Sequence, residues 1–326
     1  MLQFVAGPLE FTTPQAADIA PLIWLGAAVV LAFIAILFII RSLARFFSQT
    51  QHAFDRVVLQ IQVPKEKRGE GNANSNNADD RLEQIREEIG LTETIFSTLS
   101  GLHPQSGLGT WLYGRNDHAA FEIVMHNNLI YFYLAVPARR RNFIEQQIHA
   151  QYPYAHIEEM LDYNIFSPHS TIAGAYLTAK LPNTLPFKTY KKMDSDPLSS
   201  LLNTLAKINE GNSSAAVQYV VRPAGSKWRR KSIRLVREVR KGKKFEYVLH
   251  KHRALHILEV FMSTIVEILS GTKHEKESYT LSSLEEEMVK GVEEKMTKGG
   301  LQATIRVISA SEQPEMAQMN LENIIN

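Results

Sequence analysis

The chain has 326 residues, which at roughly 150 residues per domain leaves room for about two domains. Hydrophobic residues make up 44% and charged residues 21%, a globular balance that excludes a wholly disordered chain and a protein with many membrane spans. The absence of cysteine excludes a disulfide scaffold, cysteine-ligated zinc, iron–sulfur clusters and a thiol nucleophile. The 36 Lys and Arg against 34 Asp and Glu give a net charge of only +2, but the positive charges are unevenly distributed.

Residues 21–40 (PLIWLGAAVVLAFIAILFII) contain no charge and predict a transmembrane helix. Twenty residues at about 1.5 Å each reach roughly 30 Å, the thickness of the hydrocarbon core of a bilayer. A cleaved signal peptide fits less well, because a charged leading region and a small-residue cleavage pattern are both missing. Residues 1–20 contain no Lys or Arg, whereas Arg41, Arg45 and Arg56 follow the span. The positive-inside rule therefore predicts a short N-terminus outside and a cytoplasmic C-terminal bulk.

Residues 41–55 predict a helical continuation of the span. Leu43, Phe46, Phe47 and Phe54 fall on one face of such a helix. This apolar face suits either the membrane interface or a packing partner, and the two alternatives stay open.

The first cytoplasmic stretch, residues 56–168, predicts the order strand, helix, strand, strand, helix, strand. These elements are the run RVVLQIQV, a helix from Asp80 to Gly101, two strands around Asn127–Asn128, a helix over 139–152 and the strand HIEEML. Between the first two elements, residues 65–80 lack apolar residues other than alanine and predict a flexible loop. The order is that of the split βαβ arrangement of ferredoxin-like folds.

The second stretch, residues 169–326, predicts a looser copy of this module. Its elements are a strand from Ile172, a helix capped by Asp196 and ending before Gly211, the strand AAVQYVVRP, the helix SSLEEEMVKGVEEKM, the strand LQATIRVISAS and a final helix over 313–325. A helical insertion occupies about 224–281. The predicted fold is therefore α+β, with one transmembrane helix and two ferredoxin-like modules, the second interrupted by a basic helical insertion.

This insertion carries the charge asymmetry. Residues 222–253 contain thirteen Lys and Arg against two Glu, a local charge of +11, which leaves −9 for the rest of the chain. Helical spacing puts Arg230, Arg234, Arg237 and Lys241 on one stripe, and Ile233, Val236 and Val239 on a narrower apolar stripe. The predicted polyanion-binding residues are Arg229, Arg230, Arg234, Arg237, Lys241, Lys243 and Lys244. Anionic lipid, nucleic acid, a protein partner and a solvated arm facing the acidic rest of the chain all stay open.

No constellation predicts catalysis or a cofactor. The histidines His250, His252 and His256 lack an HExxH pattern and have basic neighbours, so a surface cluster is favoured over a metal site. The glutamates of the 283–297 helix are typical of a solvated face. The chain has no GxSxG motif and no phosphate-binding GxxxxGK[ST] loop. We therefore expect no enzyme activity, no metal and no cofactor.

Three stretches resemble a known family: residues 131–168, 185–225 and 301–324. The family comprises membrane-anchored bacterial proteins of the candidate-phyla type whose common domain has no assigned function. Its members are associated with, or fused to, HerA/TraC-type ATPases of type IV secretion-like systems. The present chain departs from the fused members because it ends at Asn326 without an ATPase domain, so the resemblance implies a separate ATPase partner and no catalytic residue.

The expected function is that of a non-enzymatic assembly or docking component, anchored by a single span in the bacterial inner membrane. The alternative is a membrane-tethered nucleic-acid-binding protein that uses the basic arm, residues 222–253. The expected partners are the HerA/TraC-type ATPase and the membrane, while anionic lipid, DNA and a second copy of the chain stay open.

Overall fold

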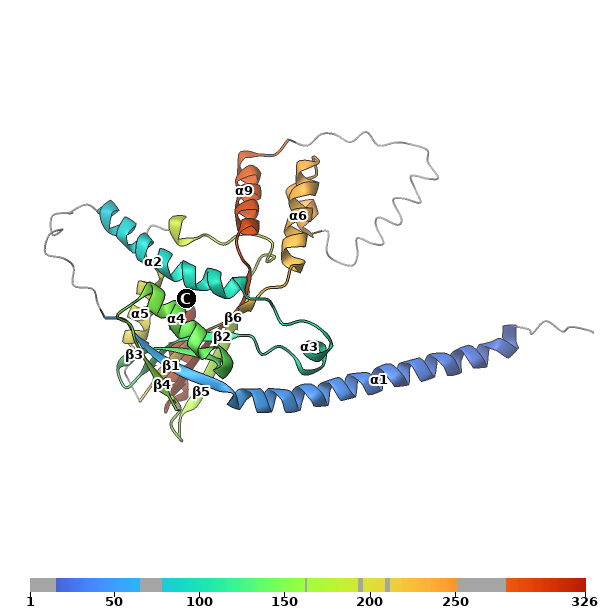
Figure 1. The fold of residues 1–326 in the computed structure, drawn as a ribbon, viewed down its shortest axis with the longest axis horizontal. Helices are drawn as coiled ribbons and strands as arrows, with labels where there is room; N and C mark the ends of the chain where they lie inside the picture. The colour runs from blue at the N-terminus through green and yellow to red at the C-terminus, as the bar shows by residue number, and fades with distance from the viewer. Residues whose placement is uncertain (1–15, 65–77, 162, 193–195, 209–211, 251–279) are drawn as a thin grey trace, which may run out of the picture. The chain divides into compact units, whose positions relative to one another are not determined.

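The computed structural model describes residues 16–64, 78–161, 163–192, 196–208, 212–250 and 280–326 (Figure 1). The chain divides into two compact units. The first contains the N-terminal residues up to 54 together with 106–115, and the second contains 55–105 and 116–326.

The first unit is built on the helix α1 (Ala16–Phe54), which runs without interruption for 39 residues. The predicted span and its juxtamembrane continuation are thus one helix. Within it, Trp24–Ser48 is apolar enough to cross a membrane, and an N-terminal signal sequence would show the same property. The short helix α3 (Leu108–Tyr113) packs on α1.

The second unit contains a seven-stranded antiparallel sheet in the order β4-β1-β3-β2-β6-β7-β5. The strands are β1 (Arg56–Gln62), β2 (Ala119–His126), β3 (Leu129–Pro137), β4 (His156–Met160), β5 (Thr171–Leu177), β6 (Ser214–Pro223) and β7 (Leu301–Ser311). The strands of both predicted modules therefore share one sheet, which is joined where β2 pairs with β6. At this join Ile123 lies opposite Val217.

The β2–β3 hairpin forms where the Asn-Asn dipeptide predicts it. Asn127 and Asn128 have φ angles of 50° and 62°, the left-handed region that asparagine tolerates better than most residues. Two consecutive residues of this conformation make the tight turn whose twist matches that of the strands. His126 therefore pairs with Leu129, and this pairing sets the register of the hairpin.

Four helices cover one face of the sheet: α2 (Ala78–Gly101), α4 (Arg141–Gln151), α5 (Pro197–Ala206) and α10 (Pro314–Ile325). Leu59 and Leu134 project from this face into a core that contains Ile95 of α2 and Ile144 of α4. A second part of the core lies under α5 and α10. Asp196 caps α5 as predicted, through a bond from the Leu198 amide to its side chain, although the helix ends at Ala206. On the opposite face, the Tyr133 ring stacks on Tyr163, and Ile165 packs in the same cluster.

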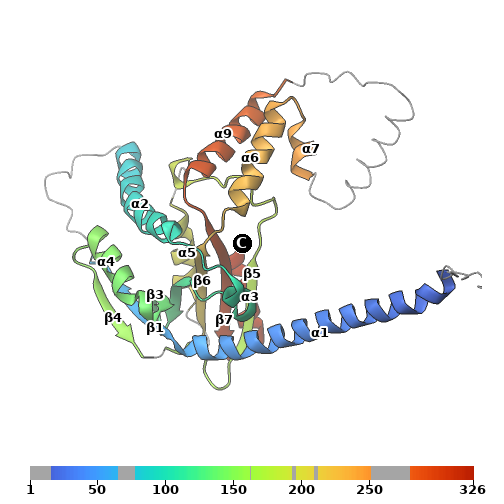
Figure 2. The same ribbon diagram turned by 45° about the vertical axis from the view of Figure 1, so that its right-hand side comes forward.

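An arm of helices connects β6 to β7, as Figure 2 shows. Its described parts are α6 (Lys227–Arg240), α7 (Phe245–His250) and α9 (Ser283–Thr297). The arm has its own apolar core, which includes Val239, Phe245 and Val292. A capping box starts α9, because the Ser282 hydroxyl accepts a hydrogen bond from the Glu285 amide while the Glu285 carboxylate accepts one from the Ser282 amide. Two short 3-10 turns, Ala138–Arg140 and Tyr190–Lys192, complete the described elements.

Candidate functional site

The helix α6 has a buried side and a basic side. Its buried residues, Ser232, Leu235, Val236 and Val239, recur at the helical spacing i, i+3, i+4 and i+7. The apolar members of this set pack against Val289 and Val292 of α9 and against residues of α7. Packing therefore fixes the rotation of α6 about its own axis and determines which residues it turns to solvent.

Arg230, Arg234, Arg237 and Lys241 are exposed at the side of α6 opposite to the buried one. At 3.6 residues per turn they follow one line along the helix. We call these four residues the basic face. Their stripe agrees with the spacing in the sequence, but the predicted apolar stripe was partly wrong. Ile233 is exposed, and Leu235 takes its place in the arm core because α9 and α7 contact the side of α6 centred on Val239.

The other three predicted binding residues, Arg229, Lys243 and Lys244, have interactions within the chain. Arg229 donates from Nη2 to the Lys298 carbonyl at 2.9 Å, and Lys243 forms an ion pair with Glu238. Lys244 is exposed, and it has an interaction within the chain. The neighbouring Arg240 pairs with Glu293 of α9. The arm thus uses part of its positive charge internally and presents the basic face outward. Among the described residues, Lys241 is the one member of this face near a carboxylate, 3.7 Å from Glu238.

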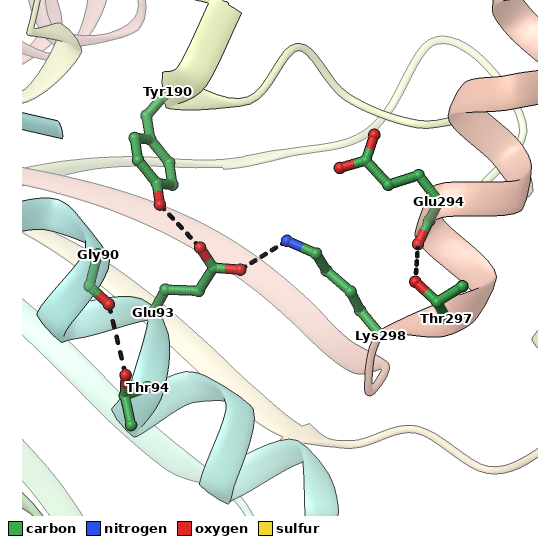
Figure 3. Close-up of polar contacts among 7 residues, drawn as sticks. All are labelled: Gly90, Glu93, Thr94, Tyr190, Glu294, Thr297 and Lys298. Atoms are coloured by element: carbon green, nitrogen blue, oxygen red, sulfur yellow. Dashed lines mark hydrogen bonds and ion pairs between the residues drawn. The ribbon is translucent and has the colours of Figure 1, made fainter. Parts of the chain in front are cut away.

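The base of the arm is attached to α2 through Glu93 (Figure 3). One carboxylate oxygen accepts a hydrogen bond from Lys298 Nζ at 2.6 Å, and the other accepts one from the Tyr190 hydroxyl at 2.8 Å. These bonds raise the pKa of Lys298 and of Tyr190, since both residues donate to the same carboxylate. Glu93 therefore connects α2, the 190–192 turn and the end of α9.

Trp228 lies against the glycine that follows α9. A Cβ atom on Gly300 would meet the indole Nε1 of Trp228 at 2.4 Å, which leaves room for glycine only. The Ala224 amide also donates to the Gly300 carbonyl at 2.9 Å. Trp228 is thus half-buried at the base of the arm.

Sequence patterns do not predict a group of charged residues that lies within the sheet. Glu122 of β2 is buried, and its carboxylate accepts hydrogen bonds from the Tyr163 hydroxyl and from Gln218 Nε2. Burial raises the pKa of Glu122, while the bond from Gln218 and the charge of Arg56 oppose the shift. One feature of the sequence could have indicated this buried glutamate. In the strand AAFEIVMH, the residues around Glu122 are apolar on both faces, which is typical of a strand covered on both sides.

His118 lies beside this group and contacts the Arg56 guanidinium through Nε2. Burial, together with the positive charges of Arg56 and Arg222, lowers the pKa of His118 from 6.5 to about 4. Both Glu122 oxygens have partners, and in the described part of the chain His118 has no hydroxyl nucleophile bonded to it. This arrangement is suited to holding β1, β2 and β6 together.

We expect His118 to make the fold less stable in acid. Its folded-state pKa is below the unfolded value, so the unfolded chain binds the proton more readily and stability is lost as the pH falls from about 6.5 through 4. Because the ring is half-buried and solvent screens part of the effect, the loss between pH 7 and 4.5 is about 1 to 2 kcal/mol. Urea unfolding of the full chain at both pH values should show a smaller acid loss for His118→Asn than for the wild type. His149→Asn, at an exposed position of α4, is the control; equal losses in all three proteins would contradict this role.

No metal site is present among the described residues, which contain no group of three or more His, Asp or Glu able to hold an ion. Of the histidines considered from the sequence, His252 and His256 lie outside the described residues. The predicted flexible loop lies mostly outside them as well.

A family of unknown function matches residues 76–325, which is most of the chain. The chain belongs to the DUF8128 family. This membership confirms the expectation of a domain with no assigned function. No match was found among curated proteins or among solved structures.

The DUF8128 match begins shortly before α2 and excludes β1. Yet β1 lies inside the sheet between β3 and β4, where Leu59 is opposite Leu134 on one side and Glu159 on the other. The folded unit therefore begins at the start of β1, on the N-terminal side of the matched residues. The basic face and the Glu122 group both lie within the matched residues.

Proposed function

We propose that this DUF8128 protein is a non-enzymatic, membrane-anchored docking component that binds a polyanionic partner through the basic face of α6. The observation that carries the proposal is the position of the four cations opposite the buried side of a helix whose rotation is fixed by packing. Three of them, Arg230, Arg234 and Arg237, have no acidic partner within the described residues, so their charge is available to a ligand.

Retention of α1 as an anchor is part of this proposal. The helix continues beyond the apolar stretch to Phe54, and its arginines Arg41 and Arg45 both contact Trp111. Cleavage of a signal sequence after the apolar stretch would cut α1 close to the two arginines that hold this tryptophan. These contacts support a retained single span, and the charge bias of the flanks supports an N-terminus outside and a sheet in the cytoplasm. The bacterial inner membrane is proposed from the family resemblance.

The machinery and the partner of this protein are proposed from the family resemblance. We propose that the protein works in a type IV secretion- or conjugation-like machinery with a separate HerA/TraC-type ATPase as its partner. We also propose that the two halves of the sheet are ferredoxin-like modules. For the first half, the strand order β4-β1-β3-β2 with crossover helices α2 and α4 supports this description.

A membrane-tethered nucleic-acid-binding protein is the second candidate. The basic face places four cations along about 16 Å of helix, a line that can follow one phosphate backbone. Three of the four residues are arginines, and a guanidinium group can donate two parallel hydrogen bonds to the oxygens of one phosphate.

The test compares two variants of equal charge. The first replaces Arg230, Arg234, Arg237 and Lys241 by Gln; the second replaces four exposed cations outside α6 by Gln, namely Arg139, Lys180, Lys188 and Lys207. In detergent-solubilised full-length protein, the first variant should bind duplex DNA or anionic liposomes at least about tenfold more weakly, with the control near the wild type. If four phosphates are contacted, the log–log slope of DNA affinity against salt should be about −3.6 for the wild type and near zero for the first variant.

The outcomes separate the candidates. Strong salt-dependent DNA binding favours the nucleic-acid candidate, whereas crosslinking in native membranes that recovers an ATPase with the wild type but not with the first variant favours docking. Equal binding by both variants, at every salt concentration and with every ligand, would contradict a binding role for the basic face.

A further inference from the structure

The segment that contains α3 belongs to the same compact unit as α1, although the sheet-forming chain precedes and follows it. Two glycines bound the helix, Gly107 with a φ of 106° and Gly114 with a φ of 91°. These are conformations that residues with side chains rarely adopt, and they let the chain turn sharply on either side of a six-residue helix.

Trp111 attaches α3 to the turn of α1 that contains Arg41 and Arg45. The Arg41 guanidinium lies 4.7 Å from the centroid of the indole ring, and Arg45 Nη2 donates to the Trp111 carbonyl at 3.3 Å. Arg41 is the first charged residue after the uncharged stretch 21–40. The contacts therefore place α3 beside the turn of α1 at which the predicted bilayer core ends.

The apolar side chains of α3 are not used in a protein core. None of its residues is buried, and the exposed fractions are 86% for Leu108, 47% for Trp111 and 52% for Tyr113. At the same level α1 exposes Phe46 and Phe47. An exposed set of aromatic and aliphatic residues with arginines beside it marks an interaction surface.

We propose that α3 is a second membrane-contact element, which inserts Leu108, Trp111 and Tyr113 into the interface of the bilayer that α1 spans. The inference rests on the proposed membrane anchoring of α1. Tryptophan and tyrosine favour the headgroup level because their rings combine an apolar body with a polar tip. Arg41 and Arg45 can reach lipid phosphates from the same level while their stems cover apolar surface. The fitting partner is therefore a lipid surface that is continuous with the one around α1.

The cysteine-free chain allows a direct measurement of depth. Single-cysteine variants Phe33→Cys, Leu108→Cys and Tyr154→Cys of the full-length protein are nitroxide-labelled and placed in nanodiscs of phosphatidylethanolamine and phosphatidylglycerol. All three positions are exposed in the structure: Phe33 in the apolar stretch, Leu108 in α3, and Tyr154 between α4 and β4 in the sheet unit. Collision rates with oxygen, which concentrates in lipid, and with a water-soluble nickel complex report the depth of each label.

The label at 108 should collide more often with oxygen than with nickel, at a depth between those at 33 and 154. A label at 108 that is as accessible to nickel as the one at 154, with 33 embedded, would overturn the interfacial role of α3 and leave the anchor intact. A label at 33 that is accessible to nickel would overturn both proposals.

Discussion

The substitution Leu134→Ala should destabilise the full-length protein by about 3 kcal/mol, because it removes a fully buried side chain at the centre of the sheet. Leu134 is 0% exposed and packs in one cluster with Leu59, Ile95 and Ile144, which come from β1, α2 and α4. These neighbours belong to three elements of one continuous sheet-and-helix layer, so they can collapse only partly into the space left by the leucine. The cost therefore contains both lost burial and a cavity.

The matched control is Leu129→Ala in the same strand, since Leu129 is exposed beside the hairpin turn. The same chemical change there should cost less than about 0.5 kcal/mol. Thermal unfolding in detergent should show the Leu134 variant melting roughly 6 to 12 °C below the wild type, with the control close to it. If the two variants melted together, the position of the core between α2, α4 and the sheet would be wrong.

The substitution Gly300→Ala should cost about 2 kcal/mol, although alanine normally stabilises a chain relative to glycine. The new Cβ would lie 2.4 Å from Trp228 Nε1 and 2.5 Å from Cε2, so either the indole or the start of β7 must move. Trp228 lies in the first turn of α6, and its displacement should loosen the base of the arm. Hydrogen exchange should therefore become faster in α6 and α9.

Gly225→Ala is the control, because this glycine lies in the same region before α6 and a Cβ there would meet no atom within 4 Å. It should leave stability and exchange nearly unchanged. The double variant Gly300→Ala with Trp228→Leu should recover part of the loss, since a smaller side chain leaves space for the new methyl group. Equal stability of the Gly300 and Gly225 variants would show that Trp228 does not pack as described.

Sequence periodicity was sufficient for features that depend on near neighbours. The uncharged stretch 21–40 predicts a helix long enough to span a membrane, and the Asn-Asn dipeptide predicts the β2–β3 turn through the positive φ angles that it tolerates. The stripe of Arg230, Arg234, Arg237 and Lys241 also follows from helical spacing alone. Each of these features is set by interactions within a few residues of the chain.

The remaining features depend on contacts between distant residues, which local spacing does not encode. Pairing of β2 with β6 joins the strands of the two predicted modules into one sheet, and it also buries Glu122 beside Gln218. Packing of α6 on α9 and α7 determines that Leu235 is buried and Ile233 exposed. The contact of Trp111 with Arg41 and Arg45 links residues about seventy positions apart. Hydrophobic pattern predicts that an amphipathic element will bury one side, but only the tertiary structure decides what covers it and which charges are then left facing solvent.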